Sequence, residues 1–440
     1  MKKFYLHRLG CPKNDVDAEY IAGLFCQEGL SSCANPEDAD LIIVNTCGFI
    51  DDAKEESIGA ILSLLELKKS NPELKLIVTG CLSQRYAEQL AEEIPEIDGI
   101  FGIDGLKSLN EYIRSPRHII QVEQPSVKYC EPDTPRQLSD SEVFAYLKIS
   151  DGCDNRCSYC AIPDIRGSFR SRNMAVIVDE ARFLLDSGKK EIILVSQEST
   201  RYGEDLFGQP RLIELLDKIS ALPGDFWLRV MYLHPLRLTE ELIEYIIDNP
   251  RLCSYFDLPL QHVSDRLLGL MNRRVSRDHI ETLLEIIRDH NKPAAVRTTF
   301  IVGFPGETDK EFEELCHFVD RWRFNRMGAF VYSEEEDTPA VNLPGKVDGE
   351  TAGRRYEELM LIQQDIAFEN NQALVGKELE IIVDASNSYK LAGQGRTRFD
   401  APEIDQTVLL KGQNFSAGMI TKVAITGWDG YDLIAEGSRS

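Results

Sequence analysis

The chain has 440 residues, 43% of them hydrophobic, which is enough for two to four domains with buried cores. Its 73 acidic and 49 basic residues give a formal net charge of −24, which argues against a general phosphate-binding surface and suits a basic partner better. We see no secretory signal and no apolar run of about 18 residues, so the sequence predicts no membrane span and a reducing, cytoplasmic location. In such a compartment, the eleven cysteines are expected to be metal ligands or core residues more often than disulfides.

The first part of the chain alternates strand and helix patterns, which predicts an open parallel α/β sheet domain over residues 1–118. Cys11, Cys47 and Cys81 each end one of its strands, at spacings of 36 and 34 residues. Ligands of open α/β folds gather at the carboxyl ends of strands, so we expect these three thiolates to bind one cluster. A single cysteine at such a place would more often be a core residue.

Proline-rich, polar sequence predicts a linker over residues 119–140. A second alternating series over residues 141–370 predicts an incomplete six-unit (β/α) barrel. Short strands with Gly-rich turns over residues 372–440 predict a small closed β-barrel, which a helix at 351–370 precedes. The expected barrel strands are 144–150, 191–197, 226–233, 255–262, 296–304 and 327–333.

Cys153, Cys157 and Cys160 form a CxxxCxxC motif directly after the first predicted barrel strand. Soft thiolates select zinc, copper(I) or iron–sulfur clusters, and no second cysteine pair of a zinc finger lies nearby. Three cysteines on a [4Fe-4S] cluster leave one iron without a protein ligand. The motif resembles that of the radical S-adenosylmethionine superfamily, which implies that the cofactor's amino and carboxylate groups bind this iron. Tyr159 matches the aromatic residue usual in that motif, although it could simply pack over the cluster.

Further candidates for cofactor contact lie at later strand ends. In each case a purely structural role, such as a strand-end hydrogen bond or a tight turn, remains the alternative. They are Ser196, Gln197, Gln261, His262, Gly303 and Gly306. Three arginines after the cluster loop, Arg166, Arg170 and Arg172, are candidates to face a substrate or cofactor carboxylate, with Arg170 expected at the surface. No residue is assigned as catalytic, and the other five cysteines are given no chemistry.

Over essentially its whole length, the chain resembles the methylthiotransferase family of radical S-adenosylmethionine enzymes, whose C-terminal module is called TRAM. LGCPKNDVDAE (9–19), NTCGFIDDAKEESI (45–58), TGCLSQRY (79–86) and AIPDIRGSFRSR (161–172) are similar to the RimO type. That branch modifies an aspartate of the small-subunit ribosomal protein numbered twelve. Seven Lys and Arg against nine Asp and Glu in residues 372–440 also suit a basic protein better than RNA, although Arg396 and Arg398 could form a local basic spot.

The resemblance implies two [4Fe-4S] clusters, and S-adenosylmethionine as both methyl donor and radical source. The cluster at Cys11, Cys47 and Cys81 would carry the sulfur, and the one at Cys153, Cys157 and Cys160 would generate the radical that takes hydrogen from the aspartate β-carbon. Implied partners are the basic ribosomal protein and an electron donor such as flavodoxin or ferredoxin, with nucleic acid not primary. Two alternatives stay open: a tRNA methylthiotransferase acting on isopentenyladenosine, and a non-catalytic, metal-stabilised scaffold.

Overall fold

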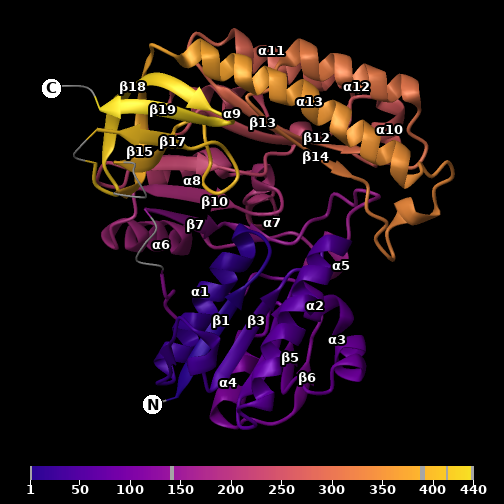
Figure 1. The fold of residues 1–440 in the computed structure, drawn as a ribbon, viewed down its shortest axis with the longest axis vertical. Coiled ribbons are helices and arrows are strands. Elements are labelled where there is room, and N and C mark those ends of the chain that lie inside the picture. The colour runs from indigo at the N-terminus through magenta and orange to yellow at the C-terminus, as the bar shows by residue number, and fades with distance from the viewer. Residues whose placement is uncertain (1, 139–142, 387–391, 413–414, 438–440) are drawn as a thin grey trace.

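The computed structural model of the protein describes residues 2–138, 143–386, 392–412 and 415–437. Figure 1 shows an N-terminal α/β unit, a central unit of strands and surrounding helices, and a small C-terminal β-barrel that lies against the central unit. The predicted junction between linker and barrel at 140 and 141 falls outside the described residues, as does the predicted end of the C-terminal module at 440.

The N-terminal unit is a six-stranded sheet with the order β2-β1-β3-β4-β5-β6, in which all pairs are parallel. Its strands are β1 (Lys3–Arg8), β2 (Ser31–Ser32), β3 (Leu41–Thr46), β4 (Lys75–Gly80), β5 (Gly99–Phe101) and β6 (Ile119–Gln121). Strands β3 and β4 each contain a continuous apolar run, LIIV and LIV, as is typical of parallel strands whose two faces are both covered. One face carries α2 (Asp51–Leu65) and α3 (Cys81–Glu93), and the other carries α1 (Pro12–Gln27) and α4 (Leu106–Arg114).

The central unit contains the six predicted barrel strands, arranged as two three-stranded parallel sheets, β11-β10-β7 and β12-β13-β14. The strands are β7 (Phe144–Lys148), β10 (Glu191–Val195), β11 (Trp227–Val230), β12 (Tyr255–Gln261), β13 (Ala295–Val302) and β14 (Arg326–Val331). A parallel bridge between Leu228 and Leu252 and a hydrogen bond from the Leu233 amide to the Asp257 carbonyl (2.9 Å) join the two sheets.

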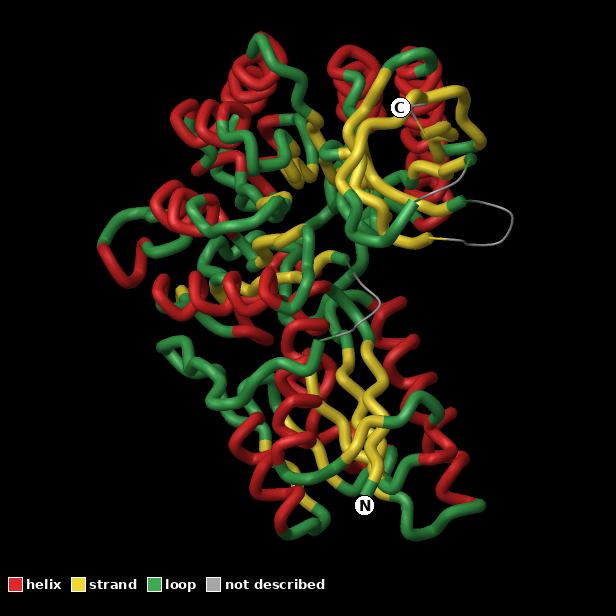
Figure 2. The backbone as a smooth tube through the Cα atoms, turned by 90° about the vertical axis from the view of Figure 1, so that its left-hand side faces the viewer, coloured by secondary structure: helices red, strands yellow, loops and turns green. Residues whose placement is uncertain are grey.

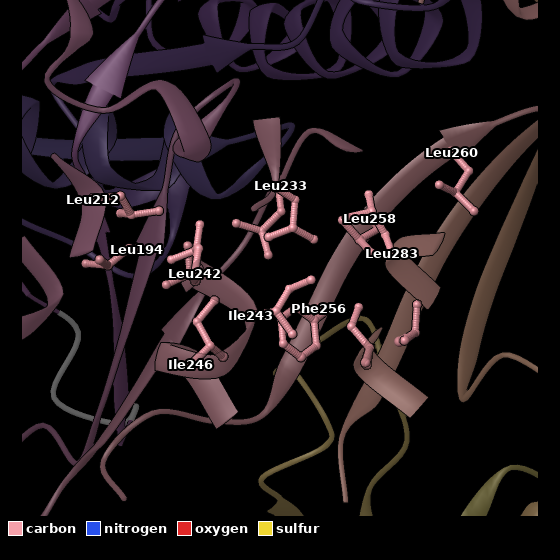
Figure 3. Packing of buried hydrophobic residues seen from close by; sticks show 14 of the residues in the cluster. Leu194, Leu212, Leu233, Leu242, Ile243, Ile246, Phe256, Leu258, Leu260 and Leu283 are labelled. Atoms are coloured by element: carbon pink, nitrogen blue, oxygen red, sulfur yellow. The ribbon is translucent and has the colours of Figure 1, made fainter. Parts of the chain in front are cut away.

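Helices cover the outside of the central sheets, and the apolar side chains between the two layers form the largest core of the molecule (Figure 3). These helices are α6 (Met174–Asp186), α8 (Leu212–Ser220), α9 (Glu240–Asp248), α11 (Arg277–Asp289) and α12 (Asp309–Trp322). Their apolar positions recur at helical spacing, for example Leu242, Ile243 and Ile246 in α9. Shorter elements at the cluster-loop end are β8 (Ser150–Asp151), α5 (Ile162–Arg166), β9 (Arg170–Ser171), α7 (Glu204–Phe207) and α10 (Asp265–Leu270).

Helix α13 (Gly349–Leu374) leads into a closed five-stranded barrel with the order β15-β16-β17-β19-β18. Its strands are β15 (Glu378–Ser386), β16 (Gly393–Thr397), β17 (Val408–Lys411), β18 (Ile420–Asp429) and β19 (Asp432–Gly437). The predicted fold class, an open parallel sheet, a partial barrel and a small β-barrel, is therefore confirmed.

The two outer units fill the open interior of the partial barrel from opposite ends. Val16 and Tyr20 of α1 and Ala401 of the C-terminal module belong to one buried cluster with the inward-facing strand residues. Trp227 and Tyr255, which begin their strands, mark the end that the C-terminal module covers. Figure 2 shows the N-terminal sheet and the C-terminal barrel at opposite ends of the molecule.

Candidate functional site

Three strand ends of the N-terminal sheet bring Cys11, Cys47 and Cys81 to one edge. Cys47 follows β3 directly, and Cys81 follows β4 directly and begins α3. Cys11 is the N-cap residue of α1 and stands three residues after Arg8, the last residue of β1. Parallel pairing of β1 with β3 and of β3 with β4 places the three carboxyl ends side by side.

The side chain of Asn14 links two of these strand ends by hydrogen bonds. Its side-chain amide donates to the Leu9 carbonyl (2.9 Å) and to the Thr46 carbonyl (3.0 Å), the residues that precede Gly10 and Cys47. Its oxygen lies 3.9 Å from the Cys81 sulfur. Burial raises the pKa of the Cys81 thiol to about 11, against the opposing charge of Arg166. Iron binding to this thiol therefore has to displace a proton, as metal binding to cysteine generally does.

The second triad lies in the loop between β8 and α5. The Cys153 amide donates to the Gly167 carbonyl (3.0 Å) and the Cys160 amide to the Cys157 carbonyl (3.1 Å), which curls the loop back on itself. Arg273 donates to the Cys157 sulfur (3.6 Å). Burial raises the pKa of the Cys153 thiol to about 11.

Within the described part of the chain, no three His, Cys, Asp or Glu side chains are grouped to hold a single metal ion. A [4Fe-4S] cluster differs in that each cysteine binds a different iron, so its thiolates stand further apart than around one zinc ion. The donor set of each triad, three thiolates with no fourth cysteine in the motif, fits such a cluster with one iron open to another ligand.

Arg166 of α5 joins the two triads. It donates to both oxygens of Asp151 (3.1 and 3.2 Å), at the start of the second cysteine loop, and to the Asn14 oxygen (2.6 Å) beside the first triad. Asp17 of α1 lies 3.4 Å from the same guanidinium group. Arg166 is therefore paired with protein carboxylates, and it links the N-terminal sheet to the barrel loop.

The other two arginines of this segment are also buried. Arg170, which we expected at the surface, is 2% exposed and contacts Asp104 (3.2 Å) and the Arg166 carbonyl (2.6 Å). Arg172 pairs with Glu131 and Glu180, both at 2.7 Å. The expectation for Arg170 was wrong because the N-terminal unit covers this side of the barrel, which the sequence does not reveal.

Several buried polar atoms at the mouth of the barrel have no hydrogen-bond partner among the described residues. Both amide atoms of Gln197, the Ser150 hydroxyl, the His234 Nε2 and the Arg273 Nε belong to this group. Burial and two nearby arginines lower the pKa of His234 to about 2, so this imidazole is neutral. Unpaired buried polar atoms are costly, and their collection at the carboxyl ends of the strands fits a site for a polar cofactor such as S-adenosylmethionine.

The remaining predicted contacts have visible partners within the protein. The Ser196 and Ser199 hydroxyls lie 3.0 Å apart. His262 accepts from the amides of Val263 and Ser264 at Nδ1, and its Nε2 lies 3.2 Å from Glu307. Both nitrogens of this imidazole are thus occupied by the loop, and its contact with a cofactor stays a prediction.

Gln261, Gly303 and Gly306 lie at the same mouth with positive φ angles of 72°, 73° and 88°. A Cβ on Gly303 would stand 2.6 Å from that of Ala352, so helix α13 alone requires glycine there. Tyr159 packs edge-to-face on Phe304, with 6.5 Å between ring centroids, next to the second triad.

Two site residues escaped the sequence reasoning. Arg273 reaches Cys157 from the segment after α10, 116 positions away, and no local pattern marks it. Glu307 accepts from the Gly303 amide (2.6 Å) and from Arg355 (2.7 Å), and so fixes the glycine turn. Its place in the GFPGET segment was the signal that could have identified it.

The two arginines proposed as a basic spot on the C-terminal module are engaged in ion pairs. Arg396 is 2% exposed and pairs with Glu191 of β10 (2.7 Å) and Asp384 (2.8 Å). Arg398 lies over the Trp227 ring and contacts Glu380 (2.6 Å). This pair of arginines holds the module on the barrel and does not form a free phosphate-binding surface.

Comparison with known proteins places the chain in a class and then in a family. Profiles of the Radical SAM superfamily, of Uncharacterized protein family UPF0004 and of the TRAM domain match residues 147–319, 3–102 and 375–437. Among solved structures, the fold is similar to the radical S-adenosylmethionine methyltransferase TsrM from Kitasatospora setae, with a TM-score of 0.56 at 15% identity over 86% of this chain and 78% of that one. The protein is therefore a radical S-adenosylmethionine transferase with an added N-terminal sheet and a TRAM module.

The relatives define the family. The chain is 44% identical to ribosomal protein uS12 methylthiotransferase RimO of Clostridioides difficile over 99% of both chains. It is 46% identical to that of Thermosipho africanus over 98% of both and 44% identical to that of Thermotoga maritima over 97% of both. The chain belongs to the RimO family of ribosomal protein methylthiotransferases, which confirms the predicted branch over the tRNA and scaffold alternatives. None of the helices that the structure describes is both long and apolar enough for a membrane span.

Proposed function

We propose that this protein transfers a methylthio group to the β-carbon of an aspartate in ribosomal protein uS12, at the junction between its N-terminal sheet and its barrel. One observation carries the proposal: the two cysteine triads, from separate units of the fold, lie on either side of one buried pairing of Arg166 with Asn14 and Asp151. A reaction that needs a radical and a sulfur donor at the same carbon requires such an arrangement.

We assign one [4Fe-4S] cluster to Cys11, Cys47 and Cys81 and the other to Cys153, Cys157 and Cys160. When bound, these clusters and S-adenosylmethionine supply an electron, a radical able to remove hydrogen from an unactivated carbon, and the sulfur and methyl group that are transferred. No protein side chain can supply this chemistry. Ser196, Gln197, Gln261, His262, Gly303 and Gly306 remain the proposed surroundings of the cofactor, with Tyr159 over the second cluster.

The residues of the chain bind, orient and shield these groups. Arg273 places a positive charge at Cys157, and a cation beside a thiolate stabilises its charged form. The aromatic rings of Tyr159, Phe304 and Tyr332 pack edge-to-face, with centroids 6.5 and 5.3 Å apart, and through Tyr159 they place apolar surface next to the second triad. A dry surrounding keeps water and oxygen from the reactive species.

The proposed partners follow from the same site. The formal charge of −24 complements a basic ribosomal protein, and Arg396 and Arg398 are occupied by ion pairs within the protein. We propose the cytoplasm as the location, because the substrate is a ribosomal protein, and a small redox protein such as flavodoxin or ferredoxin as the electron donor.

Mass spectrometry of uS12 from cells with and without this gene tests the function directly. We expect the mass of a methylthio group to be present only when the gene is present. A variant with Cys11, Cys47 and Cys81 replaced by Ala should still form deoxyadenosine in vitro while methylthio transfer stops. Unmodified uS12 with the gene present, or persistent transfer by the triple variant, would contradict the proposal or its assignment of the first triad.

A further inference from the structure

Lys13 is a buried cation with no carboxylate partner among the described residues. Its side chain comes from the start of α1, the residue is 8% exposed, and its ammonium group lies 3.6 Å from the centroid of the Tyr232 ring. The ammonium group donates a long hydrogen bond to the Ser196 carbonyl (3.4 Å) and also hydrogen-bonds the side chain of Tyr232. Nowhere in the described ranges does a carboxylate stand within 4 Å of it, although a buried ammonium group normally requires such a partner.

Lys148 has the carboxylate partners that Lys13 lacks. Lys148 lies in the same junction, is 4% exposed and pairs with both Asp17 and Asp151. The fold therefore satisfies one lysine of this junction with two carboxylates and gives the other an aromatic ring and one carbonyl. A cation over an aromatic face stays charged and available to a further ligand.

A second unsatisfied group lies at the same strand end. Gln197 follows Ser196, whose carbonyl accepts from Lys13, and both side-chain amide atoms of Gln197 are buried without a partner in the described structure. An amide left unpaired in the protein interior is unfavourable, and a ligand that accepts its N–H would restore the missing hydrogen bond. An ammonium group and an amide donor together suit a carboxylate.

We propose that Lys13, with the Gln197 amide as a second donor, binds the carboxylate of the substrate aspartate and thereby determines the specificity of the enzyme for an acidic side chain. The inference rests on the proposed function and adds to it the group that recognises the target residue. Holding the carboxylate fixes the adjoining β-carbon, the carbon that reacts, between the two triads.

Two observations favour the substrate over the cofactor as the source of this carboxylate. Lys13 stands two residues after Cys11, so it belongs to the triad to which we assign the sulfur. The second triad, to which we assign cofactor cleavage, has its own cation in Arg273, which contacts Cys157 and keeps a buried Nε without a partner among the described residues. The cofactor carboxylate thus has a separate candidate partner.

The test compares two peptides of uS12, one with the target aspartate and one with asparagine in its place, for binding to the cluster-loaded enzyme by fluorescence anisotropy. We expect the wild type to bind the aspartate peptide about tenfold more tightly. Lys13→Met should remove this preference and Lys13→Arg should keep most of it, while the affinity for S-adenosylmethionine stays within about twofold in both. Lys75→Met, which removes a half-exposed lysine of the same sheet at the opposite end of its strand, is the matched control and should change neither affinity.

Three outcomes would overturn the inference. Equal binding of both peptides by the wild-type enzyme would overturn it. This outcome needs no variant, so the inference can be tested even if Lys13→Met fails to fold. A Lys13→Met enzyme that keeps the preference but binds S-adenosylmethionine more weakly assigns the carboxylate to the cofactor. A Lys13→Arg enzyme that loses the preference while Lys13→Met keeps it excludes a role for the charge. Absence of methylthio transfer by the wild type would instead count against the proposed function.

Discussion

The two cysteine triads are built in opposite ways. Cys153, Cys157 and Cys160 lie within eight residues of one loop, and backbone hydrogen bonds from Cys153 and Cys160 shape that loop. Cys11, Cys47 and Cys81 span 71 residues and meet only because three parallel strands end at the same edge. The loop site therefore depends on local turn geometry. The sheet site depends on the whole sheet and on Asn14, which hydrogen-bonds two of its strand ends.

Substitution of the glycines next to the cysteines is expected to have the largest effect, and it separates the contributions of the two triads to the reaction. Gly80 has a φ of +101°, and a Cβ there would stand 2.4 Å from the Thr46 carbonyl of the neighbouring strand. Gly152 has a φ of +72°, and its Cβ would stand 2.1 Å from the Ser168 carbonyl. Alanine at either position has to displace backbone, and a shift of about 1 Å at a reacting group can cost on the order of 100-fold in rate.

We expect Gly80→Ala to lose the iron of one cluster and methylthio transfer while it still forms deoxyadenosine, and Gly152→Ala to lose both reactions. Iron analysis and assays of both products measure this. Gly59→Ala, in the open on helix α2, is the control and should leave both reactions intact. Loss of deoxyadenosine formation in Gly80→Ala would show that the two sites are not separable in this way.

Arg166 tests whether the two triads act as one site. Arg166→Met leaves Asp151 and Asp17 with one cation fewer and breaks the link to Asn14, and loss of one partner of a buried pair costs about 3–5 kcal/mol. We expect methylthio transfer to fall about 100-fold and deoxyadenosine formation only a few-fold. Arg166→Lys keeps the charge but lacks the planar guanidinium group that contacts Asp151 and Asn14 together. Its rate of methylthio transfer should therefore lie between those of the wild type and Arg166→Met. Equal loss of both products would indicate general unfolding, which thermal denaturation would reveal.

A smaller effect is expected where the N-terminal sheet meets the segment after β14. Glu335 is 1% exposed and pairs with Lys54 of α2 (3.0 Å) and Arg85 of α3 (2.7 Å). Glu335→Gln should loosen the N-terminal unit on the barrel and lower methylthio transfer about tenfold, with faster hydrogen exchange in α2 and α3. Glu334→Gln, which removes a half-exposed pair with Lys346, should have no effect. Unchanged exchange in Glu335→Gln would mean that other contacts hold the two units together.

The sequence by itself determined the three kinds of unit and the six barrel strands, and it marked both sets of cysteines as candidate cluster ligands, an assignment that stays a prediction. Apolar periodicity predicts strands and helices locally, and the place of Cys11, Cys47 and Cys81 near the carboxyl ends of neighbouring parallel strands follows from the topology. Resemblance to the family then supplied the cofactors and the branch, which no spacing of residues can give.

Only the tertiary structure decided what surrounds the cysteines. Arg170 and Arg396 read as surface charges because a sequence does not show which unit covers which face, yet both are buried between units. Arg273 reaches Cys157 from a distant segment, and Lys13, although it is close to Cys11 in sequence, contacts Ser196 of the barrel, 183 positions away. The roles of both cations therefore depend on which partners the fold places beside them. Long-range contacts of charged side chains leave no periodic trace in a sequence, because they depend on the packing of whole units and not on the local backbone.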